Sequence, residues 1–574
     1  MSSMRKALVA VVLAAGLATF AAAAAQSGSP GFKTAQGPMI DPVAPGVTYE
    51  AIISVGDTVD DYMFESIPDG ISLAKNGKGT VDLYVNHETS TVPFPYTFNR
   101  TTGTGSGFND FTNSLVSKLR LHQKSGGVLS GSYAISSDAN FQRFCSNFLA
   151  TEEHGFDRPL LLTNEEGIDW VNRSGKAWPT TIGAPHARQI GAAVAIDEKS
   201  GEVRAIWGMG RHNHENSVAI PGYGHPVVLS GDDSFVTTPP QSQLYSYIAG
   251  SSDAVWNDQG DLWAFAADGV DDYFDFTPGS TVSVTGKFVK VPKDVATGRR
   301  PDGTDLMAAD KGYPAPPSTG WQLDARTGAP LDGPQWVLEH WGDTQPQKVF
   351  EFVRVEDVAY DRRPGMQHVI YVVDSGRGTA DPAGGPPSPQ PGRSTNGRIW
   401  KLVLDKTDPT KVTSFSILIE GDDAAVKSVD EIHQPDNIES TARSLLITED
   451  PGSSQQFPVT ATDPASPTFD ARATTARLWQ FDLATGTKRV VAKVNQAADE
   501  GPLDKDAASS RGNLGAWESS GIVDASSVFG PGAFFIDVQA GTLVMTEETR
   551  VEGPDTLTYQ REGGQLGLLR VPGA

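Results

Sequence analysis

Two short stretches of this chain match each other nearly residue for residue: residues 397–405 read GRIWKLVLD and residues 476–484 read ARLWQFDLA. Each is the third of four β-rich runs bounded by Gly, Asp or Pro, as strands usually are. The runs of the two units are residues 358–361, 369–374, 398–404 and 412–419, then 436–438, 444–450, 477–483 and 489–494. A four-strand unit that repeats along a chain is typical of a β-propeller.

An acidic residue directly before the first strand marks each unit, and six positions fit this pattern. They are Asp69, Glu153, Glu215, Glu356, Asp436 and Glu518. Three of the intervals between consecutive acids are about 80 residues, a plausible length for one four-stranded unit with its loops. The short interval after Glu153 indicates a trimmed unit. The long interval before Glu356 indicates an insertion at residues 268–348, which we expect to lie over one face of the domain.

The sequence therefore predicts an all-β fold, a six-bladed β-propeller with a large inserted loop region. The last unit supplies only three strands, near residues 520–524, 532–538 and 565–570, whereas residues 48–55 form a strand-like run before the first unit. We expect this N-terminal strand to complete the last blade and close the ring, because closure removes exposed sheet edges. Two β domains divided near residues 268–348 are the alternative architecture.

The N-terminal segment has the pattern of a general secretory signal peptide over residues 1–25, with Arg5 and Lys6 before an apolar run and small residues at its end. We therefore expect a secreted or periplasmic protein whose residues 26–574 form one domain and which is a monomer. The net charge of −24 argues against nucleic acid and anionic membranes as partners. A single cysteine, Cys145, excludes an internal disulfide and leaves a buried residue, a metal ligand or a reactive thiol.

Acids brought together at one mouth of a propeller would repel one another unless cations held them. Carboxylates are hard oxygen donors that suit calcium, and neighbouring imidazoles would admit iron, zinc or manganese. The histidines in or beside these turns are His87, His154, His212, His214 and His433. A second set of acids ends the second strands and could equally consist of turn formers: Glu88, Glu165, Glu166, Asp232, Asp233, Asp374, Glu449, Asp450 and Asp537.

Other catalytic motifs find no support in the sequence. There is no Gly-x-Ser-x-Gly elbow, no phosphate-binding loop of the Gly-x-x-x-x-Gly-Lys-[Ser/Thr] type and no His-Glu-x-x-His zinc helix. The Gly-x-Gly at residues 376–378 is not followed by a plausible helix, so it does not predict a dinucleotide site.

Five stretches taken in order resemble the PhoX-type alkaline phosphatases, a family of secreted bacterial six-bladed propellers. They are Asn-His-Glu at 86–88, Thr-Asn-Glu-Glu-Gly at 163–167, His-Glu-Asn-Ser at 214–217 leading to Gly-Asp-Asp at 231–233, Val-Glu-Asp-Val-Ala at 355–359 and Pro-Asp-Asn at 435–437. The resemblance implies calcium- and iron-dependent hydrolysis of phosphate monoesters, with Arg377 placed near the phosphate. The expected metal ligands are Glu166, Glu215, Glu356 and Asp436, joined by Asp69, Glu518, Glu88 and Glu153.

Two departures from that family favour calcium over iron. Asn164 stands where the family has a cysteine before its paired acids, although Cys145 matches another nearby family cysteine. The export signal also lacks the twin arginine that the family commonly uses. Two other functions stay open: a non-catalytic, calcium-stabilised propeller that serves as a binding or scaffold module, and another propeller hydrolase of the phytase or lactonase type.

Overall fold

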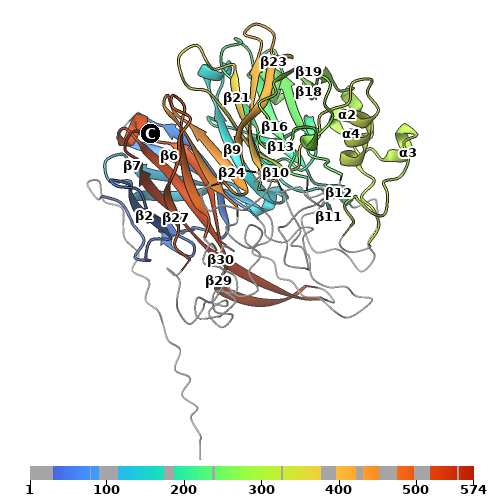
Figure 1. The fold of residues 1–574 in the computed structure, drawn as a ribbon. Helices are drawn as coiled ribbons and strands as arrows, with labels where there is room; N and C mark the ends of the chain where they lie inside the picture. The colour runs from blue at the N-terminus through green and yellow to red at the C-terminus, as the bar shows by residue number, and fades with distance from the viewer. Residues whose placement is uncertain are drawn as a thin grey trace, which may run out of the picture.

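The structure is a computed structural model that describes residues 30–77, 79–88, 114–172, 187–234, 239–324, 328–376, 396–421, 431–450, 475–496, 517–552 and 555–574. Within these ranges the chain consists mostly of β-strands, with a few short helices, so the expected all-β fold is confirmed (Figure 1). No helix of the described residues is long and apolar enough to cross a membrane.

Two four-stranded sheets open the fold. The first contains, in order, β5 (Pro68–Lys75), β6 (Thr80–His87), β7 (Leu115–His122) and β8 (Val128–Ile135). The second contains β9 (Phe144–Ala150), β10 (Leu160–Glu165), β13 (Ala192–Asp197) and β14 (Val203–Arg211). The first strand of the second sheet thus begins at Phe144. The expectation that Glu153 precedes this strand is wrong, because Glu153 follows β9 in a short 3-10 helix.

The next two four-strand groups are joined into one nine-stranded sheet. Its order is β15 (Val218–Ala219), β16 (Val227–Gly231), β17 (Leu244–Ile248), β18 (Asp261–Ala267), β19 (Val284–Lys290), β23 (Lys411–Glu420), β22 (Arg398–Leu404), β21 (Val369–Asp374) and β20 (Val355–Tyr360). The connection is made by β19, which pairs antiparallel with both β18 and β23. The side chains of Phe350, Trp400 and Phe415 pack across this sheet, with Trp400 stacked 4.9 Å from Phe415.

Two further sheets hold the C-terminal part of the chain. One contains β24 (Pro435–Ser440), β25 (Ser444–Glu449), β26 (Arg477–Asp482), β27 (Lys488–Val494) and, at its edge, β1 (Ile40–Pro42). The other contains β28 (Glu518–Asp524), β29 (Ala533–Glu552), β30 (Asp555–Arg570) and β2 (Thr48–Ser54). The predicted pairing of the N-terminal strand with the C-terminal strands is confirmed, since Thr48 lies opposite Arg570 and Ser54 opposite Gln565.

The first strands of these groups contact one another in a cyclic order. Strand β5 contacts β9, β9 contacts β15, and β16 contacts β20; β20 contacts β24, β24 contacts β28, and β28 returns to β5. The described part of the segment 268–348 supplies β19, a 3-10 helix (Tyr273–Asp275) and the α-helices α2 (Lys293–Thr297), α3 (Ala308–Lys311) and α4 (Pro334–Asp343). Helices α2 and α4 pack against β14 and lie at one side of the molecule (Figure 1).

Candidate metal centre

The same irregularity occurs near the start of five first strands. In β5, β9, β20, β24 and β28, two consecutive residues lie opposite a single residue of the neighbouring second strand. Such a β-bulge turns the side chain of an extra residue away from its normal alternation, and bulges commonly occur beside functional sites. The first residues of these bulges are Asp69, Cys145, Glu356, Asp436 and Ser520.

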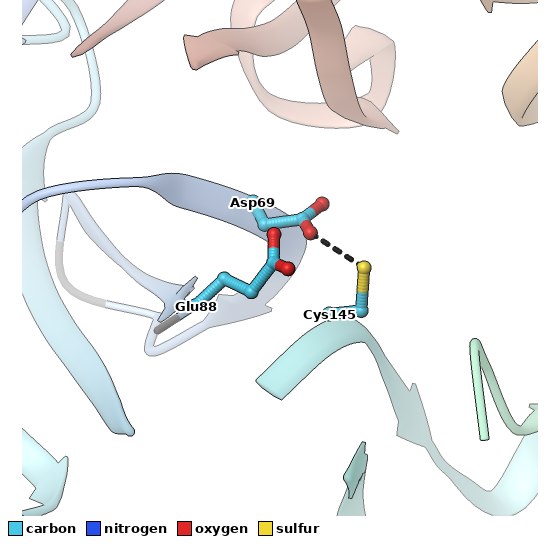
Figure 2. A group of neighbouring side chains, drawn as sticks. All are labelled: Asp69, Glu88 and Cys145. Carbon is cyan, nitrogen blue, oxygen red and sulfur yellow. Dashed lines mark hydrogen bonds between the residues drawn. The ribbon is translucent and has the colours of Figure 1, made fainter. Parts of the chain in front are cut away.

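Four of these bulge residues lie, with three other acids, in three overlapping groups of potential metal ligands. Asp69, Glu88 and Cys145 form the first group, and Figure 2 shows them pointing toward one another. The other two groups are Cys145, Glu166 and Glu215, then Glu215, Glu356 and Asp436. Within each group the ligand atoms lie within 4.8 Å of one another. Cys145 and Glu215 each belong to two groups, so the three groups form one continuous cluster.

The carboxylates of this cluster are buried and repel one another. Glu215 is only 1% exposed. Burial, together with repulsion by Glu166 and Glu356, raises its pKa well above the usual range. Burial likewise raises the pKa of Glu88 to about 7, against the opposing attraction of Arg143. Burial and the negative charge of Asp69 also raise the pKa of the Cys145 thiol, which donates a hydrogen bond of 2.8 Å to an Asp69 carboxylate oxygen. Without a bound cation, these groups therefore favour their neutral forms.

Two arginines offset part of the negative charge. The Arg143 Nε lies 2.7 Å from a Glu88 oxygen and 2.8 Å from a Glu166 oxygen. Arg354 donates two hydrogen bonds of 2.6 Å to Asp233 and lies 3.0 Å from Glu356. Arginine forms such planar, paired contacts with carboxylates readily. Two positive charges are fewer than the seven carboxylates named here, so the cluster retains the capacity to hold cations.

The acids at the ends of the second strands have two different roles. Some accept hydrogen bonds from their own sheet, and others contact the arginines of the cluster. Glu449 accepts hydrogen bonds from the His433 backbone, from the Arg477 guanidinium at 2.8 Å and from Trp479 Nε1 at 2.8 Å. In the equivalent unit, Asp374 accepts from three backbone N–H groups and from Trp400 Nε1 at 3.4 Å. The Trp of the repeated Arg-x-Trp thus supports the acid that ends the second strand in both units. The arginine does so only in the second unit, because Arg398 pairs with Glu420 instead. Glu166 and Asp233, second in their pairs, contact the arginines of the cluster.

Four predicted positions lie outside the three groups. Glu518 is partly buried, and burial and the charge of Asp450 raise its pKa well above the usual range, but it precedes the bulge of β28. Glu153 is exposed. Asn164 is buried with its amide 2.8 Å from the Ser217 hydroxyl. Arg377 lies outside the described residues.

Sequence reasoning missed that Cys145 occupies the ligand position of the second unit. The sequence contains a pattern that could have shown this. Phe144-Cys145 are the first two residues of β9, just as Pro68-Asp69 begin β5 and Val355-Glu356 begin β20. The sequence leaves Cys145 open between a buried residue, a metal ligand and a reactive thiol, and it assigns Glu153 to the second unit instead. The arginines Arg143 and Arg354 each stand directly before such a dipeptide, and their role in the cluster was also missed.

The donor set suits two kinds of metal. The group of Glu215, Glu356 and Asp436 offers only carboxylate oxygens, the ligands that calcium prefers. The two groups that contain Cys145 add a thiol, which favours softer transition metals such as iron or zinc. A scan against protein-family models matches no family, and a search of curated proteins finds no match.

Proposed function

We propose that this chain is a secreted, metal-dependent phosphatase that hydrolyses phosphate monoesters at the cluster formed by Asp69, Cys145, Glu215, Glu356 and Asp436. The observation that carries the proposal is the sharing of Cys145 and Glu215 between neighbouring ligand groups. Shared ligands hold several cations close together, and closely spaced metals stabilise both the attacking and the leaving oxygen of a phosphoryl ester.

The proposed architecture is a six-bladed β-propeller. The cyclic contacts of β5, β9, β15 with β16, β20, β24 and β28 support it, because the first strands of propeller blades line a central channel. The nine-stranded sheet then corresponds to two neighbouring blades whose outer strands are joined through β19. Pairing of β2 with β30 closes the ring by joining the two ends of the chain in one blade.

The residues of the chain have separate tasks in this proposal. The carboxylates of Glu215, Glu356 and Asp436 bind calcium, while Cys145 gives the neighbouring groups affinity for iron. Arg143 and Arg354 hold the acids in place through their ion pairs. Bound metals would supply an activated oxygen nucleophile and orient the ester. Arg377, predicted from the sequence to lie near the phosphate, would bind two phosphate oxygens of a small substrate.

The test is hydrolysis of a chromogenic phosphate monoester by the purified mature chain, with calcium, with calcium plus iron, and with EDTA. We expect turnover that requires calcium and that Glu356→Gln reduces at least tenfold. Glu153→Gln is the matched control, because this exposed carboxylate lies outside the ligand groups and its loss should leave turnover unchanged.

The same assay separates the alternatives. Calcium binding without turnover of any phosphate monoester would refute the phosphatase proposal and favour a calcium-stabilised binding or scaffold module. Hydrolysis of phytate or of a lactone in place of simple monoesters would favour one of the other propeller hydrolases.

A further inference from the structure

A bridge of two side chains, Ser146 and Asn437, crosses the ring of first strands beside the metal centre. Ser146 follows the ligand Cys145 in β9, and Asn437 follows the ligand Asp436 in β24. Asn437 Nδ2 donates a hydrogen bond of 3.2 Å to the Ser146 hydroxyl oxygen. In the cyclic order of the first strands, two units separate β9 from β24 in either direction. The bond therefore spans the ring instead of joining neighbouring strands.

The Ser146 hydroxyl also contacts a metal ligand. It donates a hydrogen bond of 3.2 Å to a Glu215 carboxylate oxygen, and the Ser146 backbone N–H donates another of 3.2 Å to the Glu215 carbonyl. A side-chain amide nitrogen only donates hydrogen bonds and an ionised carboxylate only accepts them, so the single hydroxyl proton of Ser146 is directed to Glu215. Asn437 thus orients Ser146, and Ser146 orients the carboxylate that two ligand groups share.

Asn437 is the fixed end of this bridge. Its side chain is buried, and the residue lies in the bulge of β24. The Asn437 backbone N–H donates a hydrogen bond of 2.8 Å to Thr448 Oγ1, and the same hydroxyl donates one of 3.2 Å to the Asn437 carbonyl. Because Thr448 belongs to the neighbouring strand β25, the backbone that carries the amide is attached to its own sheet on both sides of the side chain.

The residues that follow two other ligands make a second contact of the same kind. Asn216 follows Glu215 and donates a hydrogen bond to Asp357, which follows Glu356. The other carboxylate oxygen of Asp357 accepts a hydrogen bond of 2.8 Å from the Ile438 backbone N–H in β24. Together with the bridge, these contacts form a polar layer that lies one residue beyond the ligands.

A cavity of about 700 Å³ borders this polar layer. Its walls include Ser146, Asn216, Asp357 and Asn437, whereas the seven members of the three ligand groups, all of them described residues, do not line it. Side chains beside a cavity lack close-packed neighbours on that side. Hydrogen bonds, more than packing, therefore determine where these four side chains lie.

We propose that Ser146 is a positioning residue of the metal centre: its hydroxyl, oriented by Asn437, holds the Glu215 carboxylate where the neighbouring ligand groups share it. Groups that hydrogen-bond a metal ligand orient it for the metal, and their loss commonly lowers metal affinity about 10- to 100-fold. The role rests on the proposed function in one respect, that the cluster binds cations, and it is independent of the ester that is hydrolysed.

Titration with calcium in a calorimeter tests this role. The mature chain would be stripped with EDTA, desalted and titrated with calcium chloride. We expect Ser146→Ala to raise the calcium Kd about 10- to 100-fold, and Ser146→Thr, which keeps a hydroxyl, to bind more tightly than Ser146→Ala. Ser440→Ala is the matched control and should keep the native Kd, because Ser440 is a buried serine of the same cavity wall whose hydroxyl donates to the Tyr360 carbonyl.

A double-mutant cycle distinguishes positioning from general support of the fold. Asn437→Ala should weaken calcium binding in the native background and add little in the Ser146→Ala background, because Asn437 acts through Ser146. Urea unfolding in EDTA identifies the variants that fold. A native Kd in folded Ser146→Ala, or losses that simply add in the double variant, would overturn the role.

The outcomes also separate this role from the proposed hydrolysis. If Ser146→Ala does not fold, Asn437→Ala carries the test, and a native calcium Kd in that variant would overturn the proposal. Calcium binding that weakens as expected without turnover of any phosphate monoester would refute the phosphatase and support the positioning role. A native chain that binds no calcium would refute both.

Discussion

Replacing Glu215 by glutamine should change stability in opposite directions with and without calcium. Glu215 belongs to two ligand groups, and four other carboxylates repel it: Glu166, Glu356, Asp69 and Asp436. In the metal-free protein the substitution removes this repulsion. In calcium it removes a ligand. If Glu215 only supported the fold, its replacement would lower the stability of the protein both with and without calcium.

The two magnitudes follow from the geometry and from binding linkage. At 4.8 Å, the greatest separation of ligand atoms within a group, two ionised carboxylates repel by about 3.5 kcal/mol at an effective dielectric constant of about 20. The metal-free Glu215→Gln variant should therefore gain stability of about that order at a pH where the acids ionise. With calcium at about a thousand times the native Kd, binding contributes about 4.1 kcal/mol. If Glu215→Gln weakens calcium affinity a hundredfold, calcium binding at the same concentration would stabilise the variant by only about 1.4 kcal/mol. The variant would thus lose about 2.7 kcal/mol of stability relative to the native protein in calcium.

The assay is urea unfolding at pH 8, followed by tryptophan fluorescence, in EDTA and in calcium. Glu153→Gln serves as the control, because this exposed carboxylate lies outside the ligand groups and should leave both midpoints unchanged. A Glu215→Gln variant that unfolds earlier than the native protein in both buffers, by the same free energy, would refute the reasoning about the cluster.

Three further changes test other parts of the structure. Cys145→Ser should lower the iron content of the purified protein while calcium is retained, because serine removes the thiol but keeps a polar group beside Asp69; metal analysis measures both. Glu449→Gln should destabilise the protein by about 3–5 kcal/mol with or without metal, because it leaves the buried Arg477 without its carboxylate; unfolding in EDTA and in calcium checks this. Burial lowers the pKa of His154 to about 4, so the unfolded chain takes up a proton at this residue before the folded protein does. The contribution of the neutral His154 to the free energy of unfolding is therefore complete above about pH 6.5. It is lost, by up to about 3 kcal/mol, as the pH falls toward 4. His154→Gln should therefore narrow the difference between urea midpoints at pH 7.5 and pH 4.5.

The repeated strand pattern was enough to predict the β-sheets but not how neighbouring sheets join. Residues 398–404 and 477–483 read as equivalent third strands, and both form the strands expected. By contrast, β19 falls inside residues 268–348, which the sequence indicates only as an insertion. Its pairing with β23 links residues more than a hundred positions apart, and no local pattern of alternation specifies such a partner.

The ligand positions could be predicted where the acid stands two or three residues before an apolar residue that begins a strand-like run. Asp69, Glu356 and Asp436 satisfy this rule, and the structure brings each into a ligand group. Glu153 also satisfies it, yet it follows β9 and is exposed. The difference arises from the bulge, because a first-strand residue at the register shift is turned toward the cluster, and the pairing register depends on the neighbouring strand.

The five bulge positions, together with Glu215, differ in their donor chemistry around the cluster. Carboxylates occupy most of them, but a thiol stands at Cys145 and a hydroxyl at Ser520, whose oxygen donates a 2.5 Å hydrogen bond to Asp69. Softer metals are favoured near Cys145 and harder ones near Glu356 and Asp436, with Glu215 common to both sides. Because one carboxylate serves both groups, binding of a metal on one side changes the charge and position of a ligand on the other. In the proposed enzyme, calcium and the softer metal should therefore bind with coupled affinities, each altering the affinity for the other by the same factor.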